Sequence, residues 1–225
     1  ALESQLASVH AGEVDILVGT QMIAKGHDFR RITLVAAVNP DTALFSSDFR
    51  APERLFALLM QAAGRAGREA SQSATSEMWV QTFHPTHPLF EALKKHDYPA
   101  FAASELAERT AADLPPISHQ ALLRADARSQ DVAQGLLNAA REALEAQLSA
   151  DPATADLVMQ VSVYPAVPMS MQRVANVERA QMLVESGSRR ALQHFLAAWQ
   201  ADLQHLRGSH KAVLRWAIDV DPLAI

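Results

Sequence analysis

The 225-residue chain contains 49% hydrophobic and 20% charged residues and has a formal net charge of −5 at pH 7. This composition is ordinary for a globular protein with room for one large or two modest domains. The acidic net charge excludes the strongly basic footprint of many nucleic-acid binders. The lack of cysteine excludes disulfides and thiolate metal sites. No apolar run approaches the ~20 residues that a membrane helix needs.

The first half alternates segments of strand and helix character. It begins without Met, inside an apparent amphipathic helix (Leu2, Leu6 and Val9), so we expect a chain cut from a longer protein. Strands are predicted at Val14–Val18, Ile32–Val38 and Glu77–Phe83, with helices over Ala51–Ala63 and residues 90–112. Continuous apolar strands separated by a helix favour an α/β fold with a parallel sheet covered on both faces.

The second half follows a different order. Leu114-Pro115-Pro116 stops the preceding helix and marks a predicted domain boundary, so that residues 1–113 and 114–225 form two domains. Beyond it the pattern is β-α-β-β-α-β, the split βαβ arrangement of a small α+β domain. The predicted strands cover residues 118–125, 157–163, 177–184 and 212–220, the predicted helices cover 130–148 and 188–207, and residues 164–168 form a loop.

A glycine-containing motif directly follows the first predicted strand. It reads Gly19-Thr20-Gln21-Met22-Ile23-Ala24-Lys25-Gly26-His27-Asp28-Phe29. In α/β proteins ligands bind at the carboxyl edge of the sheet. The Thr20 hydroxyl and the Lys25 ammonium suit a nucleic-acid phosphate, Gly26 permits close backbone approach, and Asp28 can accept a hydrogen bond from a ribose hydroxyl. The alternative is a strand-to-helix turn with a solvated lysine.

A second motif, Gln61-Ala62-Ala63-Gly64-Arg65-Ala66-Gly67-Arg68, ends the helix predicted at Ala51–Ala63. Arginine binds two phosphate oxygens at once and stabilises charge that grows on a transferring phosphoryl group. The three-residue spacing of Arg65 and Arg68 lets both lie on one side of a helical turn. The alternative is a helix C-terminus with glycine breakers and basic residues near its negative dipole end. His84 and His87 form the closest histidine pair, which we interpret as part of a loop rather than a metal site.

Taken in order, the two motifs resemble the last two motifs of a superfamily 2 helicase motor. Further matches indicate one family within it: Asp48-Phe49-Arg50, Gln81-Thr82, Leu114-Pro115-Pro116 and the closing Asp219-Val220-Asp221-Pro222. Over essentially its whole length the chain resembles the C-terminal part of the primosomal protein N′ family of replication-restart DNA helicases.

This resemblance implies part of an ATP-dependent 3′-to-5′ DNA helicase that assembles primosomes at stalled or branched forks in the bacterial cytoplasm. Residues 1–113 would be a partial second RecA-like lobe, and residues 114–225 the family's C-terminal domain. Gln61, Arg65 and Arg68 would contact the nucleotide, with Arg68 as the arginine finger, and Gly26 and Asp28 would face ATP. Thr20, Gln21 and Lys25 would contact DNA. Implied partners are forked and single-stranded DNA, primosome proteins and the single-stranded DNA-binding protein.

Several family features are missing from the chain. It has no Gly-x-x-x-x-Gly-Lys-Thr/Ser phosphate loop and no acidic magnesium motif, so alone it should not hydrolyse the Mg-ATP that the whole enzyme uses. The family's zinc-binding cysteines are also absent, so no metal site is predicted. Residues 171–181 are less rich in aromatic and basic residues than is common in the family, which weakens the case for DNA binding by that hairpin.

Two alternatives remain open. Residues 114–225 carry ten Lys and Arg against eleven Asp and Glu, so this half suits a non-catalytic module that docks DNA or primosome partners by shape. Another superfamily 2 translocase is the second alternative. If strands of the lobe lie outside the chain, an unpaired sheet edge is expected near Val14–Val18, with poor solubility or partial disorder in residues 1–113 and an autonomous fold in 114–225.

Overall fold

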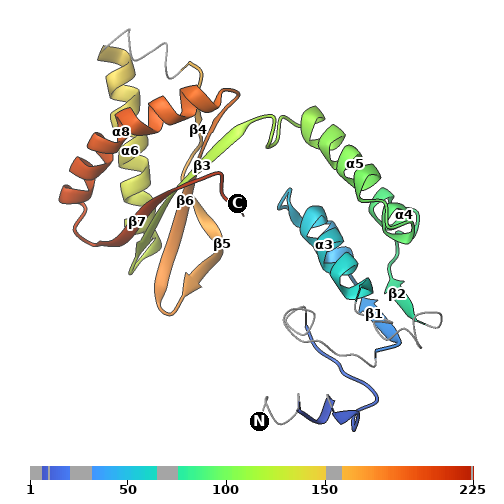
Figure 1. The fold of residues 1–225 in the computed structure, drawn as a ribbon. Coiled ribbons are helices and arrows are strands. Elements are labelled where there is room, and N and C mark those ends of the chain that lie inside the picture. The colour runs from blue at the N-terminus through green and yellow to red at the C-terminus, as the bar shows by residue number, and fades with distance from the viewer. Residues whose placement is uncertain (1–6, 10, 21–31, 65–75, 151–158, 224) are drawn as a thin grey trace. The chain divides into compact units, whose positions relative to one another are not determined.

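The computed structural model describes residues 7–9, 11–20, 32–64, 76–150, 159–223 and 225, without the side chains of residues 147–150. The chain divides into two compact units, residues 1–107 and 108–225 (Figure 1). Both combine helices and strands, which agrees with the mixed α/β class expected from the sequence.

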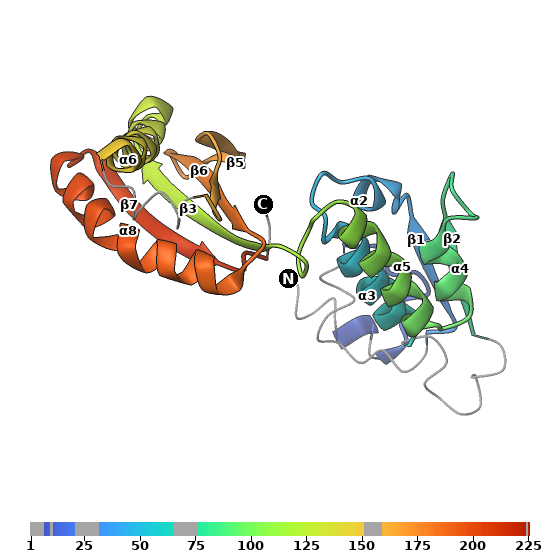
Figure 2. The same cartoon turned by 90° about the horizontal axis from the view of Figure 1, so that it is seen from above.

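In unit 1, two parallel strands form the sheet: β1 (Leu34–Val38) and β2 (Glu77–Gln81). They pair in register from Leu34 opposite Glu77 to Val38 opposite Gln81. The helices are α2 (Asp41–Leu44), α3 (Ala51–Ala63), α4 (Pro88–Lys94) and α5 (Tyr98–Ala111). Figure 2 shows α3, α4 and α5 gathered beside β1 and β2. The observed α3 matches the predicted helix residue for residue.

The core of unit 1 lies between the helices and one face of the sheet. Its buried side chains come from the helices, and Ala37, Met78 and Val80 of the strands pack against them. Successive strand residues point to opposite faces. Leu34, Val38 and Trp79, whose strand positions alternate with the inward-facing ones, are accordingly exposed. Within the described residues, one face of the sheet is therefore covered and the other presents apolar side chains.

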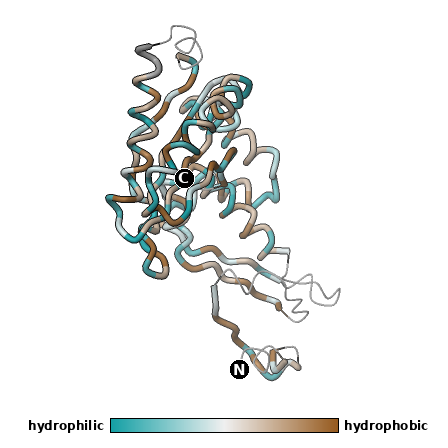
Figure 3. The backbone as a smooth tube through the Cα atoms, turned by 90° about the vertical axis from the view of Figure 1, so that its left-hand side faces the viewer, coloured by the Kyte–Doolittle hydropathy of each residue, from teal (hydrophilic) through white to brown (hydrophobic). Residues whose placement is uncertain are grey.

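Two sequence predictions in unit 1 are wrong. Val14–Val18 is neither a strand nor buried, with 80% of Ile16 and 87% of Val18 exposed. This apolar run appears brown near the N-terminus in Figure 3. An apolar run becomes a buried strand only where neighbouring strands satisfy its backbone, and none of the described strands pairs with it. Residues 90–112 form two helices instead of one, interrupted at His96, whose φ is +53°.

Unit 2 contains a five-stranded antiparallel sheet and two long helices. The strands are β3 (His119–Ala127), β4 (Ser162–Val163), β5 (Val167–Val174), β6 (Val177–Ser186) and β7 (Val213–Val220). The path through the sheet is β4-β6-β3-β7, with β5 also paired to β6. The helices are α6 (Gln130–Ala150) and α8 (Arg189–Ser209).

Helices α6 and α8 lie on the same face of this sheet (Figures 1 and 2), and the main core is between them and the strands. Alternate residues of β3 point to that face, among them Ala121, Leu123 and Ala125, each 2% exposed or less. Phe195 and Trp199 of α8 fill the core with their rings 5.2 Å apart. The Ser188 hydroxyl accepts a hydrogen bond from the Ala191 amide and caps α8.

The predicted elements of unit 2 are confirmed except around β4 and β5. Residues 159–161 precede β4 without strand structure, and residues 157 and 158 lie outside the described residues. Strand β5, which begins at Val167, replaces the end of the predicted loop 164–168. Its ladder with β6 is interrupted between Pro168 and Arg173, and most of its residues are exposed. Val167, Met169 and Met171 alternate with Pro168, Ser170 and Gln172, but the two prolines at 165 and 168 indicated a loop, because proline lacks the amide that a strand ladder uses.

Candidate functional site

Two of the eight site residues expected from the sequence lie in the described part of the chain. Gln61 is exposed in the last turn of α3, and Thr20 is exposed in a segment without regular secondary structure. Neither side chain hydrogen-bonds to another described residue. Arg65, Arg68, Gly26, Asp28, Gln21 and Lys25 lie outside the described residues, so their predicted roles remain predictions.

Helix α3 leads directly to the arginine motif. It starts with Pro52 in its first turn, where a missing amide hydrogen costs nothing, and buries Leu55 and Leu59 against the unit 1 core. The Gly64 amide donates to the Met60 carbonyl at 3.0 Å and closes the helix. The motif therefore begins where a helix anchored by its apolar face ends. Gln61, one residue beyond the buried stripe, faces solvent.

The Asp48-Phe49-Arg50 block has a structural role at the other end of α3. One Asp48 carboxylate oxygen accepts a hydrogen bond from the Arg50 amide at 2.9 Å, and the other accepts from the Arg54 guanidinium at 2.6 Å. The Arg50 guanidinium lies over the Phe49 ring, 5.4 Å from its centroid. Asp48 thus orders the turn that starts α3, a role that sequence reasoning had left without an explanation.

The carboxyl ends of β1 and β2 are joined by a buried carboxylate. Asp41, three residues after β1, accepts hydrogen bonds from the Thr82 hydroxyl at 2.5 Å and from the Phe83 amide at 2.9 Å. These donors, the Phe83 amide foremost, hold the pKa of the Asp41 carboxyl below its ordinary value of 3.8. The loop that follows β2 is therefore fastened to the turn that follows β1.

Aromatic rings gather on this fastened loop. The Phe45 ring makes an edge-to-face contact with His84 at 4.6 Å and a second one with His87 at 6.3 Å. The His87 Nδ1 atom accepts a hydrogen bond from the Leu89 amide and caps α4. Both histidines thus have loop roles, as interpreted from the sequence. The sequence analysis singled out Gln81-Thr82 but not the adjacent Phe83, which it placed at the end of the predicted strand Glu77–Phe83, whereas β2 ends at Gln81.

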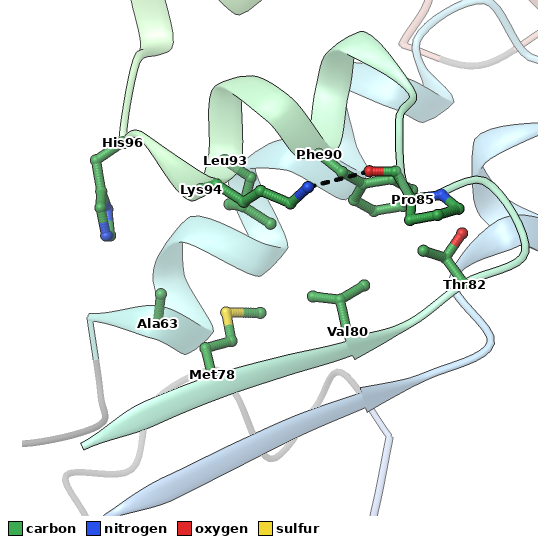
Figure 4. Close-up of a pocket in the computed structure, with 9 residues that line it drawn as sticks. All are labelled: Ala63, Met78, Val80, Thr82, Pro85, Phe90, Leu93, Lys94 and His96. Atoms are coloured by element: carbon green, nitrogen blue, oxygen red, sulfur yellow. Dashed lines mark hydrogen bonds between the residues drawn. The ribbon is translucent and has the colours of Figure 1, made fainter. Parts of the chain in front are cut away.

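A pocket of about 380 Å³ lies between β2, α4 and the end of α3. Figure 4 shows that Met78, Val80 and Phe90 give it an apolar lining. At its edge, Lys94 Nζ donates to the Pro85 carbonyl at 3.2 Å and pairs with Glu91 at 2.7 Å. Ala63, the last residue of α3, is also part of the lining. The pocket borders the start of the arginine motif but presents a mainly apolar surface, which does not suit a phosphate.

Glu185 is the centre of a polar cluster in unit 2. Its carboxylate accepts hydrogen bonds from the Ser118 hydroxyl at 2.6 Å, the Gln120 amide at 2.9 Å and the Tyr164 hydroxyl at 3.1 Å. The bond to Glu185 raises the pKa of Tyr164 above its ordinary value of 10.0. Three neutral donors satisfy this carboxylate and tie the start of β3 to the end of β6, so the cluster stabilises the sheet.

The closing Asp219-Val220-Asp221-Pro222 motif completes the sheet. Asp219 forms an ion pair with Arg124 at 2.9 Å across the β3–β7 ladder. The Asp221 amide donates to the Gln120 carbonyl at 2.9 Å, and the Asp221 carboxylate accepts from the Arg189 guanidinium at the start of α8. The motif therefore holds β3, β7 and α8 together at one end of the unit.

The sheet face of unit 2 that lacks helices carries opposite charges side by side. Arg124 pairs with Asp219, and Arg179 pairs with Asp126 at 3.7 Å. In the ladder between β3 and β7, Arg215 lies opposite Asp126. The arginines on this face are thus largely balanced by carboxylates, which weakens attraction for a phosphate backbone.

The described residues offer neither a metal site nor a membrane-spanning helix. No group of three or more His, Asp or Glu side chains among them is arranged to hold a metal ion. None of their helices is both long and apolar enough to cross a membrane.

Comparison with known proteins identifies two domains in order along the chain. The model of the helicase conserved C-terminal domain matches residues 2–70, and that of the primosomal protein N C-terminal domain matches residues 110–223. A replication restart protein PriA from Haemophilus influenzae is 39% identical over 222 residues, which are 98% of this chain and 28% of that protein. The proteins of that name from Synechocystis and Bacillus subtilis are 35% identical over 214 residues and 39% identical over 153 residues.

These alignments cover 95% and 67% of this chain, and 24% and 18% of the Synechocystis and Bacillus proteins. The chain thus spans roughly a quarter of the length of the curated relatives it matches. The resemblance that the motifs indicated is confirmed by domain models over both halves. The chain belongs to the primosomal protein N (PriA) family, whose C-terminal domain it carries at residues 110–223.

Proposed function

We propose that this chain is the C-terminal part of an ATP-dependent 3′-to-5′ DNA helicase that restarts replication at stalled or branched forks. One observation carries the proposal: a helicase conserved C-terminal domain is followed, in one chain, by the primosomal protein N C-terminal domain. Helicase-type ATPases bind ATP between two lobes, and here the second lobe would be residues 1–113. We propose the boundary with the C-terminal domain at Leu114, three residues after α5 ends at Ala111, whereas the compact units divide after residue 107.

In the complete enzyme, the second lobe would supply the arginines that contact the nucleotide. Helix α3, anchored by Leu55 and Leu59, would deliver the motif to the cleft between the lobes, and Gln61 is exposed at the end of this helix. Arg65 and Arg68 would then neutralise charge growing on the γ-phosphate, with Arg68 as the arginine finger. Gly26 and Asp28 would face ATP, and Thr20, Gln21 and Lys25 would contact DNA.

Mg-ATP hydrolysis requires groups from outside this chain. The sequence lacks a phosphate loop and an acidic magnesium motif, so the 225 residues alone should not hydrolyse ATP. The magnesium ion would neutralise phosphate charge when bound, while the arginines act from this lobe. Zinc, where relatives use it, would be held by cysteines that this chain does not contain.

The decisive experiment substitutes the proposed arginine finger in the complete helicase. Arg68→Ala should lower DNA-stimulated ATPase activity by about 10³-fold or more, because such an arginine contributes 10³–10⁵-fold. Affinity for forked DNA should stay within about twofold. A matched control is Arg141→Ala on α6, whose guanidinium pairs with Glu145 at 3.7 Å in the other unit. Unchanged ATPase activity in Arg68→Ala would refute the assignment.

The C-terminal domain supports a second candidate function, a docking module without catalysis. Its strand order places β6 between β4 and β3, with β7 outside β3, and this supports a split βαβ fold. The near balance of ten basic and eleven acidic residues over 114–225, with arginines paired on the open sheet face, favours recognition by shape. Its partners would be forked or single-stranded DNA, primosome proteins or the single-stranded DNA-binding protein, in the cytoplasm.

Salt dependence separates phosphate binding from apolar docking. Binding through phosphates weakens steeply as salt rises, because counterions are released on binding. We expect the domain's contribution, measured as the difference between the complete helicase and a variant ending at Asp113, to have a shallow salt slope. A steep slope would assign the domain bulk phosphate binding and refute the docking role.

A further inference from the structure

An exposed phenylalanine stands at the carboxyl edge of the unit 1 sheet. Phe83 is the second residue after β2 and 85% of it is exposed. Its ring contacts no other ring of the described residues. An exposed Phe forgoes the stabilisation that burying its ring would give. The position therefore suggests a surface that another molecule covers.

The backbone that carries Phe83 is held by side-chain hydrogen bonds. Its amide donates to Asp41 at 2.9 Å, and the preceding Thr82 hydroxyl donates to the other Asp41 oxygen at 2.5 Å. The next amide, that of His84, donates to Thr82 Oγ1 at 3.0 Å. The ring is therefore presented from an ordered turn, and a ligand that covers it loses less conformational entropy on binding.

Neighbouring elements add a further ring and a cation beside this loop. Phe45 at the end of α2, which is 58% exposed, makes an edge-to-face contact with His84 at 4.6 Å. Lys94 Nζ at the end of α4 donates to the Pro85 carbonyl, two residues beyond Phe83, as Figure 4 shows, and pairs with Glu91 at 2.7 Å. The Asp41 carboxylate is already occupied by its two donors. Aromatic rings and an ammonium group are therefore brought together along this loop, and both kinds of group bind single-stranded nucleic acids.

We propose that Phe83, together with the Phe45–His84 ring pair, forms a stacking site for an unpaired base of single-stranded DNA, with Lys94 near the adjoining phosphate. Stacking uses the π-face that every base has, so the site would not distinguish sequences. This inference rests on the proposed helicase function and assigns DNA contact to residues outside the two helicase motifs.

The test measures binding of single-stranded DNA by the complete helicase at one fixed salt concentration. Two oligonucleotides of equal length are compared, one of thymidines and one of abasic units, which have the phosphates without the bases. Phe83→Leu keeps an apolar side chain but removes the π-face, and Phe83→Trp restores one. The control is Trp79→Leu, which removes another exposed aromatic, one that points from the uncovered sheet face with its Nε1 bonded to Glu77.

Phe83→Leu should weaken thymidine binding about fivefold or more, since one stacked base is worth about 1–3 kcal/mol. Phe83→Trp and Trp79→Leu should bind like the wild type, and abasic DNA should bind all variants equally. Equal thymidine affinity of Phe83→Leu and the wild type would overturn the stacking site alone, as would a parallel loss on abasic DNA. A wild-type helicase that binds no single-stranded DNA would overturn the proposed function itself.

Discussion

The two units of this chain bury their sheets to different extents. In unit 2, five strands are covered by two long helices, and a core of twenty buried residues extends from Ala121 to Val213. In unit 1, the described strands are only two, and Trp79 and Val38 on the face away from the helices are exposed. A two-stranded sheet has little stability in isolation and depends on what packs against it. The larger sheet and core of unit 2 are those expected of an independent domain, and the described part of unit 1 supports our proposal that residues 1–113 are part of a larger lobe.

Amide hydrogen exchange should show the largest difference between the units. Amides at the centre of β3 and β6 should exchange only by global unfolding of unit 2, whose free energy we expect in the range of about 5–15 kcal/mol. Amides of β1 and β2 should open at a much lower free energy, because no other described strand pairs with either of them. Equal protection of both sheets would refute the contrast.

Truncation of one buried and one exposed leucine tests how much the unit 2 core contributes to stability. Leu192 is 1% exposed within that core, so Leu192→Ala should lower the free energy of unfolding by about 2–5 kcal/mol. Leu223→Ala is the matched control at a residue that is 74% exposed, where a change within about 0.5 kcal/mol is expected. Denaturant titration measures the free energy of unfolding of both variants. Similar losses in the two variants would mean that Leu192 of α8 does not stabilise the core.

A pair of valines tests which face of the unit 1 sheet is covered. Val80 of β2 packs against the core, so Val80→Lys should cost about 2 kcal/mol or more by burying a charge. Val38 of β1 faces outward, and Val38→Lys should leave stability nearly unchanged and increase the soluble fraction of this chain.

The two valine variants also test whether this face is covered in the proposed complete helicase. If another segment of the complete helicase covers the outer face, Val38→Lys should be tolerated in the 225-residue chain and destabilising in the complete protein. Thermal unfolding of both proteins makes this comparison. Destabilisation of the short chain by Val38→Lys would contradict the assignment of an uncovered face.

The smallest expected effect on stability is that of the Asp41 carboxylate at the carboxyl edge of the unit 1 sheet. Because hydrogen bonds lower the pKa of Asp41 in the folded state, its contribution to stability is present above pH 3.8 and is lost as the pH falls through and below that value. Asp41→Asn should modestly destabilise unit 1 at pH 7, and the two proteins should converge in acid. Residue-resolved NMR during urea unfolding at several pH values measures this.

Asp97→Asn serves as the control for that measurement. Asp97 accepts a hydrogen bond from the Ala100 amide at 2.9 Å at the start of α5, and asparagine caps helices about as well as aspartate. The free energy of unfolding of this variant at pH 7 should therefore be close to that of the wild type. A constant gap between Asp41→Asn and wild type down to acidic pH would show that the Asp41 charge does not contribute.

Local patterns in the sequence predicted most elements that bury one clear face. Ala51–Ala63 and the long helices of unit 2 have apolar residues at helical spacing, and these helices are observed. The missed strand, β5, has an interrupted ladder and mostly exposed residues, and Pro165 and Pro168 at its start indicated a loop. For the candidate site, the motifs indicated the family correctly, but of their eight site residues the structure describes Thr20 and Gln61.

The sequence alone was sufficient for family membership and for the helix that carries the arginine motif, because both depend on short-range spacing of residue types. Burial of Val14–Val18 could not be read from its apolar composition, since a strand is buried only when other strands and helices surround it. The link of Asp41 to Thr82 and Phe83 joins residues forty-one and forty-two positions apart. Such contacts exist only after β1 and β2 pair, and they create the edge on which Phe83 is presented.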